Sequence, residues 1–216
     1  MKVDIRYWMK RLKDLPFMSA ILVTVNVIVF LICTFTGSLL YNMGSVGALD
    51  LANGEFYRLI TSLFIHSDSS HLTGNMLILF GIGYMIETRV GHVRFVISYL
   101  FAGIGGNLLS AWIESVTGNF SSSVGASGAV FGLDGMLLAL VLFSGERIRT
   151  VTLPRLIFAI GYSIYCGFTG ENINNAAHVG GLLTGFVLTT FFCVINRIRK
   201  GQKNAVTEGL RNRDEH

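Results

Sequence analysis

Six stretches of this chain are apolar enough, and nearly long enough, to cross a lipid bilayer, which takes about 20 mostly apolar residues in a helix. They are residues 17–36, 71–88, 93–113, 127–144, 155–169 and 176–196. A backbone in lipid must satisfy its hydrogen bonds internally, so each stretch predicts a helix. With 51% hydrophobic and 14% charged residues, the composition is wrong for an ordinary soluble domain. We expect an all-α membrane protein, a bundle of six transmembrane helices.

The positions of the basic residues support this number of spans. Short cytoplasmic loops carry an excess of Lys and Arg. Apart from Arg58, every Lys and Arg lies before the first stretch, around the junctions of the second with the third and the fourth with the fifth, or after the sixth. This alternation predicts a multi-pass protein of the cell membrane with both termini in the cytoplasm.

The same interpretation divides the chain into segments. Residues 1–16 are expected to form a cytoplasmic or interfacial N-terminal segment, and residues 17–196 the membrane domain. Residues 197–216 form a polar cytoplasmic tail, which we predict to be disordered. The outer loop at 37–70 is apolar but broken by glycines, so we expect short helices that lie in the outer interface or dip into the protein.

Polar side chains are costly at membrane depth, and here they gather at one end of three stretches. His71 and Asn75 open the second stretch, and Ser127 opens the fourth. His178 lies near the start of the sixth. These three stretches run in the same direction, so the four residues are expected together at the outer end of the bundle.

Small residues allow the fourth and sixth stretches to approach closely. They recur at every fourth position, as Gly128 and Gly132 in one stretch and as Ala177, Gly181 and Gly185 in the other. This spacing lets two helix backbones come into contact. Such contact would bring Ser127 within reach of His178.

These residue types permit acyl transfer. A neutral His178 can take the proton from Ser127, whose oxygen then attacks a carbonyl. His71 and Asn75 are four residues apart on one helix face, so both can point at the oxyanion that develops. The backbone N–H of Ser127, in the first turn of a helix, is a further donor.

Each residue also has a plainer interpretation. A serine that opens a helix is usually an N-cap. A metal site is disfavoured because His66 and His71 are five residues apart, off a common helix face, and there is no H-E-x-x-H motif or cysteine pair. We expect His66 at the interface. A transporter or channel lined by Asn107 and Asp134 is disfavoured because the polar groups cluster at one end and no inverted repeat is visible.

In this order, the motifs resemble those of the rhomboid family of intramembrane serine proteases. The segments GEFYRLITSLFIHSDSSHLTGNM, GIGYMIETRVG, GASGAVFG and AHVGGLLTG follow one another at the family's spacing over about residues 54–185. The resemblance implies that Ser127 is the nucleophile and His178 the base. It also implies that Asn75 and His71 are the oxyanion partners.

The family pattern implies supporting positions as well. Phe131 matches an aromatic residue that packs on the catalytic histidine, and Gly125 and Gly128 flank Ser127 in the GASG motif. We expect all three to support the site. Glu87 and Arg58 match structural positions, where we expect hydrogen bonding or ion pairing.

By the same resemblance, the substrates are other transmembrane proteins, cut near or within their membrane segments, with no metal or organic cofactor involved. Nucleic acid is not expected as a partner, because Lys and Arg gather between the apolar stretches instead of lining one helix face. A helix hides its carbonyls in backbone hydrogen bonds, so only a locally unwound segment can offer one to Ser127. The alternative is a catalytically inactive relative that binds transmembrane clients. The presence of both Ser127 and His178 disfavours that alternative.

Two positions depart from the family pattern. Tyr57 stands before Arg58 where the family commonly has tryptophan. Asp134 lies seven residues after Ser127, on the same helix face and about 10 Å deeper. That is too far for a direct catalytic partner, so we favour a structural role for Asp134, protonated or bonded to a neighbouring helix.

Overall fold

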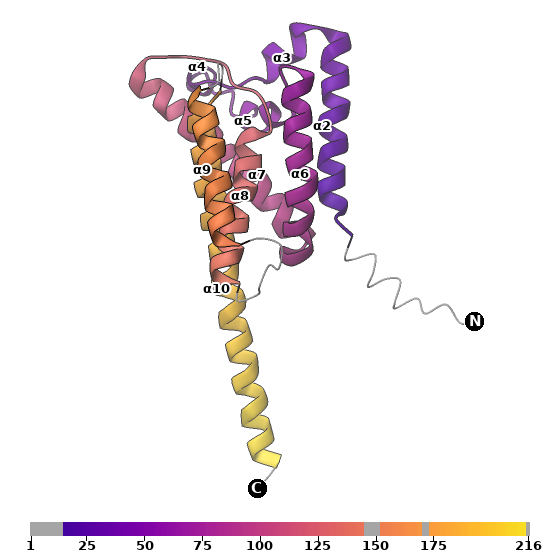
Figure 1. Cartoon of the computed structure of the whole chain (residues 1–216), viewed down its shortest axis with the longest axis vertical. Coiled ribbons are helices and arrows are strands. Elements are labelled where there is room, and N and C mark those ends of the chain that lie inside the picture. The colour runs from indigo at the N-terminus through magenta and orange to yellow at the C-terminus, as the bar shows by residue number, and fades with distance from the viewer. Residues whose placement is uncertain (1–14, 145–151, 170–172, 215–216) are drawn as a thin grey trace, which may run out of the picture.

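The computed structural model describes residues 15–144, 152–169 and 173–214; within these ranges the side chains of residues 38, 166–169 and 200–214 are not described. Its long helices run alternately up and down (Figure 1). They are α2 (Phe17–Thr36), α6 (Ser69–Val90), α7 (His92–Thr117), α8 (Ser127–Phe143), α9 (Leu153–Thr169) and α10 (Asn175–Asp214). The described residues contain no strand, only an isolated bridge between Val46 and Ser123. The predicted all-α class is confirmed, and the helices begin within three residues of the predicted starts.

Among the described residues, three helices are long and apolar enough to cross a membrane: Phe17–Thr36, His92–Thr117 and Asn175–Arg199. The helices α8 and α9 are apolar and have 17 residues each, at the short end of the range for a span. The first residue of α2 and the last of α10 lie toward the same end of the bundle (Figure 1).

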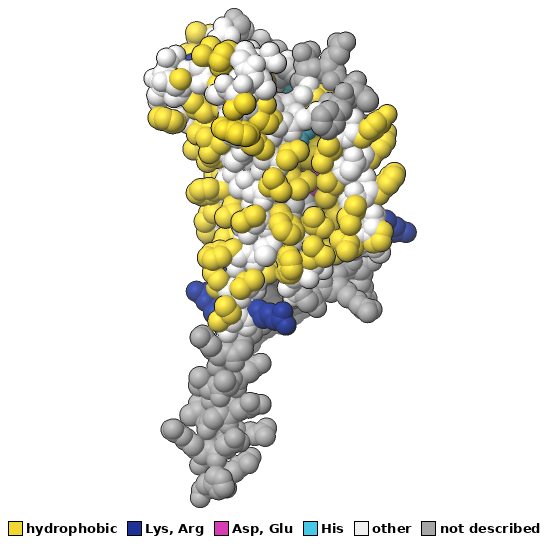
Figure 2. Space-filling view, turned by 90° about the vertical axis from the view of Figure 1, so that its left-hand side faces the viewer, with side chains coloured by type: hydrophobic (Ala, Val, Ile, Leu, Met, Phe, Trp, Pro, Cys, Tyr) yellow, Lys and Arg dark blue, Asp and Glu magenta, His cyan; other side chains and the backbone are white. Residues whose placement is uncertain are grey.

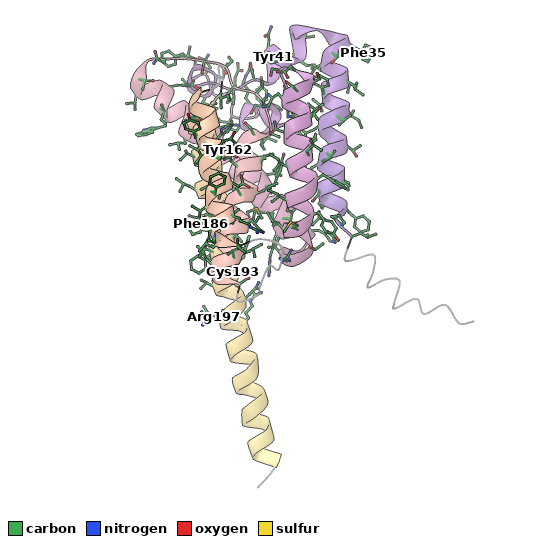
Figure 3. All side chains as sticks on the ribbon, viewed as in Figure 1. Phe35, Tyr41, Tyr162, Phe186, Cys193 and Arg197 are labelled. Atoms are coloured by element: carbon green, nitrogen blue, oxygen red, sulfur yellow. The ribbon has the colours of Figure 1, made fainter. Side chains whose placement is uncertain are left out.

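The outside of the bundle is apolar. Phe35 projects from α2 away from the other helices and is 87% exposed (Figure 3). Leu77 of α6 and Phe158 of α9 are also exposed. Figure 2 shows an apolar belt with Lys and Arg at its lower rim. A surface of this kind suits lipid on the belt and water or headgroups at the rim.

Helices α8 and α10 come into backbone contact through their glycines. A Cβ at Gly181 or Gly185 would overlap the carbonyl oxygen of Gly128 or Gly132, respectively. A Cβ at Gly135 would overlap the carbonyl oxygen of a residue in α10 in the same way. The close approach expected from the spacing of small residues is therefore confirmed.

The outer loop contains short helices, as predicted: α3 (Ser38–Gly44), α4 (Ala48–Ala52), α5 (Arg58–Thr61) and the 3₁₀ helix η1 (Ser62–Phe64). Arg58 holds them together. Its guanidinium donates to the carbonyls of Asn42 at 2.7 Å and Ser45 at 2.8 Å, and it pairs with Glu55. The structural role expected for Arg58 is confirmed.

At the opposite end, Glu87 anchors α2. Its buried carboxylate accepts from the backbone N–H groups of Met18 at 2.9 Å and Ser19 at 2.8 Å, and from the Ser19 hydroxyl at 2.6 Å. It also pairs with His92. An anionic acceptor at a helix N-terminus satisfies free N–H groups and complements the helix dipole. Glu87 thus has the hydrogen-bonding role expected for it.

The prediction of a disordered tail was wrong, because α10 continues to Asp214. The residues after Arg197 contain no proline and include three Arg, two Lys and two Glu, which favour helix. A helix that is already formed in the bundle needs only to propagate, so the nucleation cost that opposes short isolated helices does not apply.

Candidate active site

Ser127 is the first residue of α8 and is half-buried. Just before it, Gly125 has a φ of 117°, a backbone conformation that L side chains rarely adopt. The Gly125 N–H donates to the Ser62 carbonyl at 2.9 Å. Asn107 of α7 donates to the Ser62 hydroxyl at 2.9 Å and to a second outer-loop carbonyl. The outer loop and α7 therefore fix the chain that leads into Ser127.

His178 lies in the first turn of α10 and is buried. Its ring stacks on Phe131, one turn after Ser127, with centroids 4.1 Å apart and planes 11° from parallel. Its Nδ1 has no hydrogen-bond partner in the described part of the chain. The stacked aromatic ring, rather than a carboxylate, sets the orientation of this imidazole.

The starts of α8 and α10 also lie close together at the residues next to the two predicted catalytic side chains. A Cβ at Gly128 would lie 3.3 Å from the carbonyl oxygen of Ala177 and 3.8 Å from its Cβ. Gly128 follows Ser127 and Ala177 precedes His178, so the starts of α8 and α10 are side by side. No hydrogen bond joins Ser127 to His178 within the described residues. Catalytic hydrogen bonds of this kind often tighten only when substrate binds.

His71 and Asn75, one turn apart on α6, meet the same region. A Cβ at Gly125 would lie 2.5 Å from Cε1 and 2.8 Å from Nε2 of His71, so the imidazole lies against the backbone two residues before Ser127. Asn75 is 6% exposed, and its Nδ2 has no partner in the described part of the chain. An amide donor left unpaired inside a protein costs stability, and such groups often serve a ligand.

The protonation of His71 is constrained by its neighbours. Asp68 caps α6, and hydrogen bonds from the Ser70 hydroxyl, the His71 N–H and the Ser67 hydroxyl lower the pKa of its carboxyl. The Ser67 hydroxyl lies 2.8 Å from that carboxylate and 3.2 Å from Nδ1 of His71. If the Ser67 hydroxyl donates its one proton to the carboxylate, its oxygen accepts a hydrogen bond from Nδ1–H of His71. In a neutral His71 the proton is then on Nδ1, so Nε2 is an acceptor. Asn75 is consequently the better placed neutral donor to an oxyanion.

His66 was expected at the interface, but it is 3% exposed and belongs to this site. Its Nε2 accepts from the Ala126 N–H at 3.4 Å, and its ring meets His71 edge-on with centroids 5.2 Å apart. Burial, and secondly the neighbouring His71, lower the pKa of His66 to about 4, so it is a neutral acceptor at pH 7. The spacing of five residues does not place His66 and His71 on one helix face, and the structure brings them together because residues 65–68 lie outside the helices.

A polar network that the sequence did not reveal anchors the start of α10. The side-chain amide of Asn174 donates through Nδ2 to the hydroxyls of Ser110 at 2.7 Å and Ser123 at 3.1 Å, and its Oδ1 accepts from the Ala177 N–H at 3.0 Å. It therefore caps the helix that carries His178 and ties it both to α7 and to the segment leading into Ser127.

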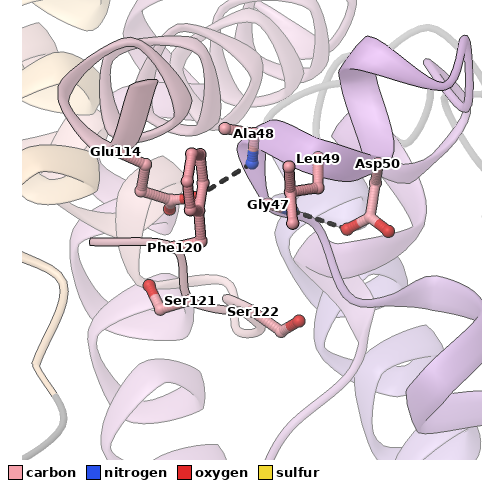
Figure 4. A pocket seen from close by; sticks show the side chains of 8 residues that line it. All are labelled: Gly47, Ala48, Leu49, Asp50, Glu114, Phe120, Ser121 and Ser122. Atoms are coloured by element: carbon pink, nitrogen blue, oxygen red, sulfur yellow. Dashed lines mark hydrogen bonds between the residues drawn. The ribbon is translucent and has the colours of Figure 1, made fainter. Parts of the chain in front are cut away.

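The cavity of about 200 Å³ drawn in Figure 4 lies beside this network, under α4. The Glu114 carboxylate accepts from the Ala48 N–H, and the Asp50 carboxylate from the Gly47 N–H. None of the predicted catalytic residues lines the cavity. Both acids are engaged in backbone hydrogen bonds, so this place is a packing site of the outer loop.

Two further predictions concern other polar residues. Within the described chain no three His, Cys, Asp or Glu residues are placed to hold a metal ion, so His66, His71 and His178 do not form such a group. Asp134 is half-buried on α8, and the bond to a neighbouring helix that we expected is not found among the described residues.

Comparison with known proteins gives one consistent family. A family model described as Rhomboid domain matches residues 53–195. YdcA of Bacillus subtilis (strain 168), provisionally named a rhomboid protease, is 36% identical over 77% of this chain and 77% of its own length. Rhomboid protease GluP of the same organism is 36% identical over 63% of this chain but only 26% of its own length. RHOMBOID-like protein 1 of Arabidopsis thaliana is 36% identical over 69% of this chain and 39% of its own.

Proposed function

The chain belongs to the rhomboid family, and on that premise we propose that it is an intramembrane serine endopeptidase with Ser127 as nucleophile and His178 as general base. The observation that carries the proposal is the contact between Gly128 and Ala177, which holds these two residues at adjoining helix starts. The relatives named as proteases support the reaction type.

In the proposed reaction, His178 takes the proton of the Ser127 hydroxyl while the oxygen attacks a peptide carbonyl. The oxyanion is stabilised by Nδ2 of Asn75 and by the N–H of Ser127 at the start of α8, neither of which has a hydrogen-bond partner among the described residues. The imidazolium then gives its proton to the leaving amine, which departs and leaves an acyl-enzyme. Water, deprotonated by His178, hydrolyses the ester and restores Ser127.

The pair works as a dyad in this proposal. In Ser-His-Asp enzymes a carboxylate holds the imidazole and stabilises its charged form. Here Nδ1 of His178 has no partner among the described residues, while the face of Phe131 covers the ring. An aromatic face attracts a cation, so it both orients the ring and favours the imidazolium that forms.

The proposed membrane arrangement has six spans, with both termini cytoplasmic and the site at the outer end. Three of the described helices are long and apolar enough to cross a membrane, and the shorter apolar helices α8 and α9 lie between two of them in the sequence. The shared end of α2 and α10 and the basic rim of the apolar belt agree with this orientation (Figures 1 and 2).

The proposed substrates are transmembrane segments of other proteins, which reach the site past α9. Among its described side chains only Leu156 and Ile160 are buried, whereas Phe158, Tyr162 and Tyr165 are exposed. A helix with few buried contacts can move at low cost. Movement of α9 would open α8 to a segment arriving from the lipid.

The test is labelling by a fluorophosphonate, which modifies activated serines, in proteoliposomes of the full chain. Wild type should be labelled and should cleave a model transmembrane substrate, and Ser127→Ala and His178→Ala should do neither. Ser115→Ala is a matched control, because Ser115 lies in the last turn of α7 and its hydroxyl donates to a carbonyl of its own helix. Labelling that survives Ser127→Ala removes the nucleophile assignment. Substrate binding without labelling of wild type favours the inactive client-binding relative.

A further inference from the structure

One face of α8 is open along its length. Ser127, Phe131, Asp134 and Leu138 are half-buried, whereas the residues between them are buried. Their spacing of four, three and four residues places them in one stripe along the helix. We call this set the open stripe of α8. A segment bound at Ser127 and continuing into the membrane would run along it.

Asp134 is the one acidic residue of this stripe, and its carboxyl has no partner among the described residues. No hydrogen bond or ion pair of its carboxyl is found in the described part of the chain, and its oxygens are not sealed from the surface. On the face drawn in Figure 2, acidic atoms reach the surface within the apolar belt, below histidine atoms. Acids inside membranes normally pair with another polar group, and unpaired ones mark substrate or ion paths.

The position of Asp134 relative to Ser127 indicates where on a bound substrate a partner for its carboxyl would lie. Seven residues of helix place Asp134 about 10 Å deeper on the same face. An extended segment covers that distance in about three residues and a helical one in about seven. We propose that Asp134 is a specificity-determining residue that binds an amide or ammonium donor, as in Asn, Gln or Lys, on the part of the substrate segment that lies deeper than the bond to be cut.

This inference rests on the proposed function and narrows its substrates to transmembrane segments with a hydrogen-bond donor at one defined depth. An unpaired donor in lipid costs free energy, so a segment that carries one is stabilised when it moves from the lipid to the enzyme. The Asp134 carboxyl can accept a hydrogen bond from this donor, whereas the lipid chains offer no acceptor. The apolar neighbours Phe131 and Leu138 would exclude water from that bond.

The experiment measures kcat/KM in proteoliposomes for one apolar substrate that carries Leu, Gln, Lys or Glu at each position from one to seven residues deeper than the cut. Wild type should prefer Gln or Lys over Leu about 3- to 18-fold at one depth, the range of single hydrogen bonds between membrane helices. Asp134→Leu should bring that ratio to about one, Asp134→Glu should restore part of it, and Asp134→Lys should shift the preference to Glu. Leu142→Ala, an exposed position one turn deeper on α8, should keep the wild-type ratio.

A second measurement separates this inference from the proposed function. Binding of the same segments, fluorescently labelled, is measured with Ser127→Ala protein and needs no cleavage. This protein should bind segments with Gln or Lys more tightly than segments with Leu, and the double variant Ser127→Ala/Asp134→Leu should not. If wild type cleaves nothing but this binding preference is found, the protease proposal fails and the inference stands. If cleavage proceeds with a flat ratio at every depth, or Asp134→Leu slows all substrates equally, the inference is overturned and the protease remains.

Discussion

Replacement of Gly181 by alanine perturbs the helix contact beside the site at its closest point. A Cβ there would lie 2.7 Å from the carbonyl carbon of Gly128 and 3.2 Å from its Cα, where ordinary contacts are 3.4 Å or more. These atoms are backbone, so no side chain can rotate away. Close-packed interiors transmit such strain instead of absorbing it, and α8 and α10 must separate by about 1 Å.

This separation acts directly on the proposed dyad, because Ser127 precedes Gly128 and His178 is one turn before Gly181. A displacement of about 1 Å in an active site costs about 100-fold in rate, which is about 2.7 kcal/mol of transition-state stabilisation. Overpacking should also lower the free energy of unfolding by about 1–3 kcal/mol. We expect kcat/KM for a transmembrane substrate, and the rate of fluorophosphonate labelling, to fall about 100-fold in Gly181→Ala proteoliposomes.

Gly81→Ala is the matched control, because a Cβ at Gly81 on α6 meets nothing within 4 Å. Alanine should stabilise that helix by about 0.5–1 kcal/mol relative to glycine and leave turnover near that of wild type. Labelling and thermal stability of Gly181→Ala equal to those of the control would refute the argument that the glycine contact positions the dyad.

Three further substitutions test the support of the site. Asn75→Ala should lower kcat/KM by about 2–4 kcal/mol through loss of an oxyanion donor, mainly in kcat; a change confined to KM would contradict that role. Glu87→Ala should leave the N–H groups of Met18 and Ser19 buried and unpaired at about 1–3 kcal/mol each, seen as a lower thermal midpoint without loss of kcat. Because burial lowers the pKa of His66 from 6.5 to about 4, the unfolded chain binds that proton more tightly, and stability should fall as pH drops from 6.5 through 4, by about 3 kcal/mol in all. His66→Gln should flatten this part of the curve, and a curve unchanged from wild type would show that His66 is already charged in the folded protein.

The helices were predictable because the membrane reduces the choice of structure. An apolar stretch in lipid must be a helix, so hydropathy alone placed the starts of α2, α8 and α10 within one residue. The contact between α8 and α10 was predictable for a related reason: the small residues lie on one face of each helix, and close approach is what such faces allow.

The support of the site was not predictable, since it depends on contacts between segments far apart in the chain. His66 accepts a bond from residue 126, and Asn174 joins Ser110 to Ser123. Neither spacing nor residue type distinguishes these from solvated loop residues. The polar composition after Arg197 predicts disorder, but the structure has a helix there, because these residues continue a helix that already begins in the bundle.

The structure separates two requirements that hydrolysis within a membrane places on one chain. A nucleophile and its base must be held rigidly, and the two residues proposed for these roles lie on α8 and α10, whose backbones touch at Gly128 and Gly181 without side chains that could change rotamer. The substrate, however, must enter from lipid as a segment as wide as a helix, so one wall must be able to move. Among the described side chains of α9 only Leu156 and Ile160 are buried, and this helix lies outside that glycine contact. Its motion can therefore widen the access to the open stripe of α8 without separating the proposed dyad, and this is why we expect changes at the glycines to act on kcat and changes on α9 to act on substrate entry.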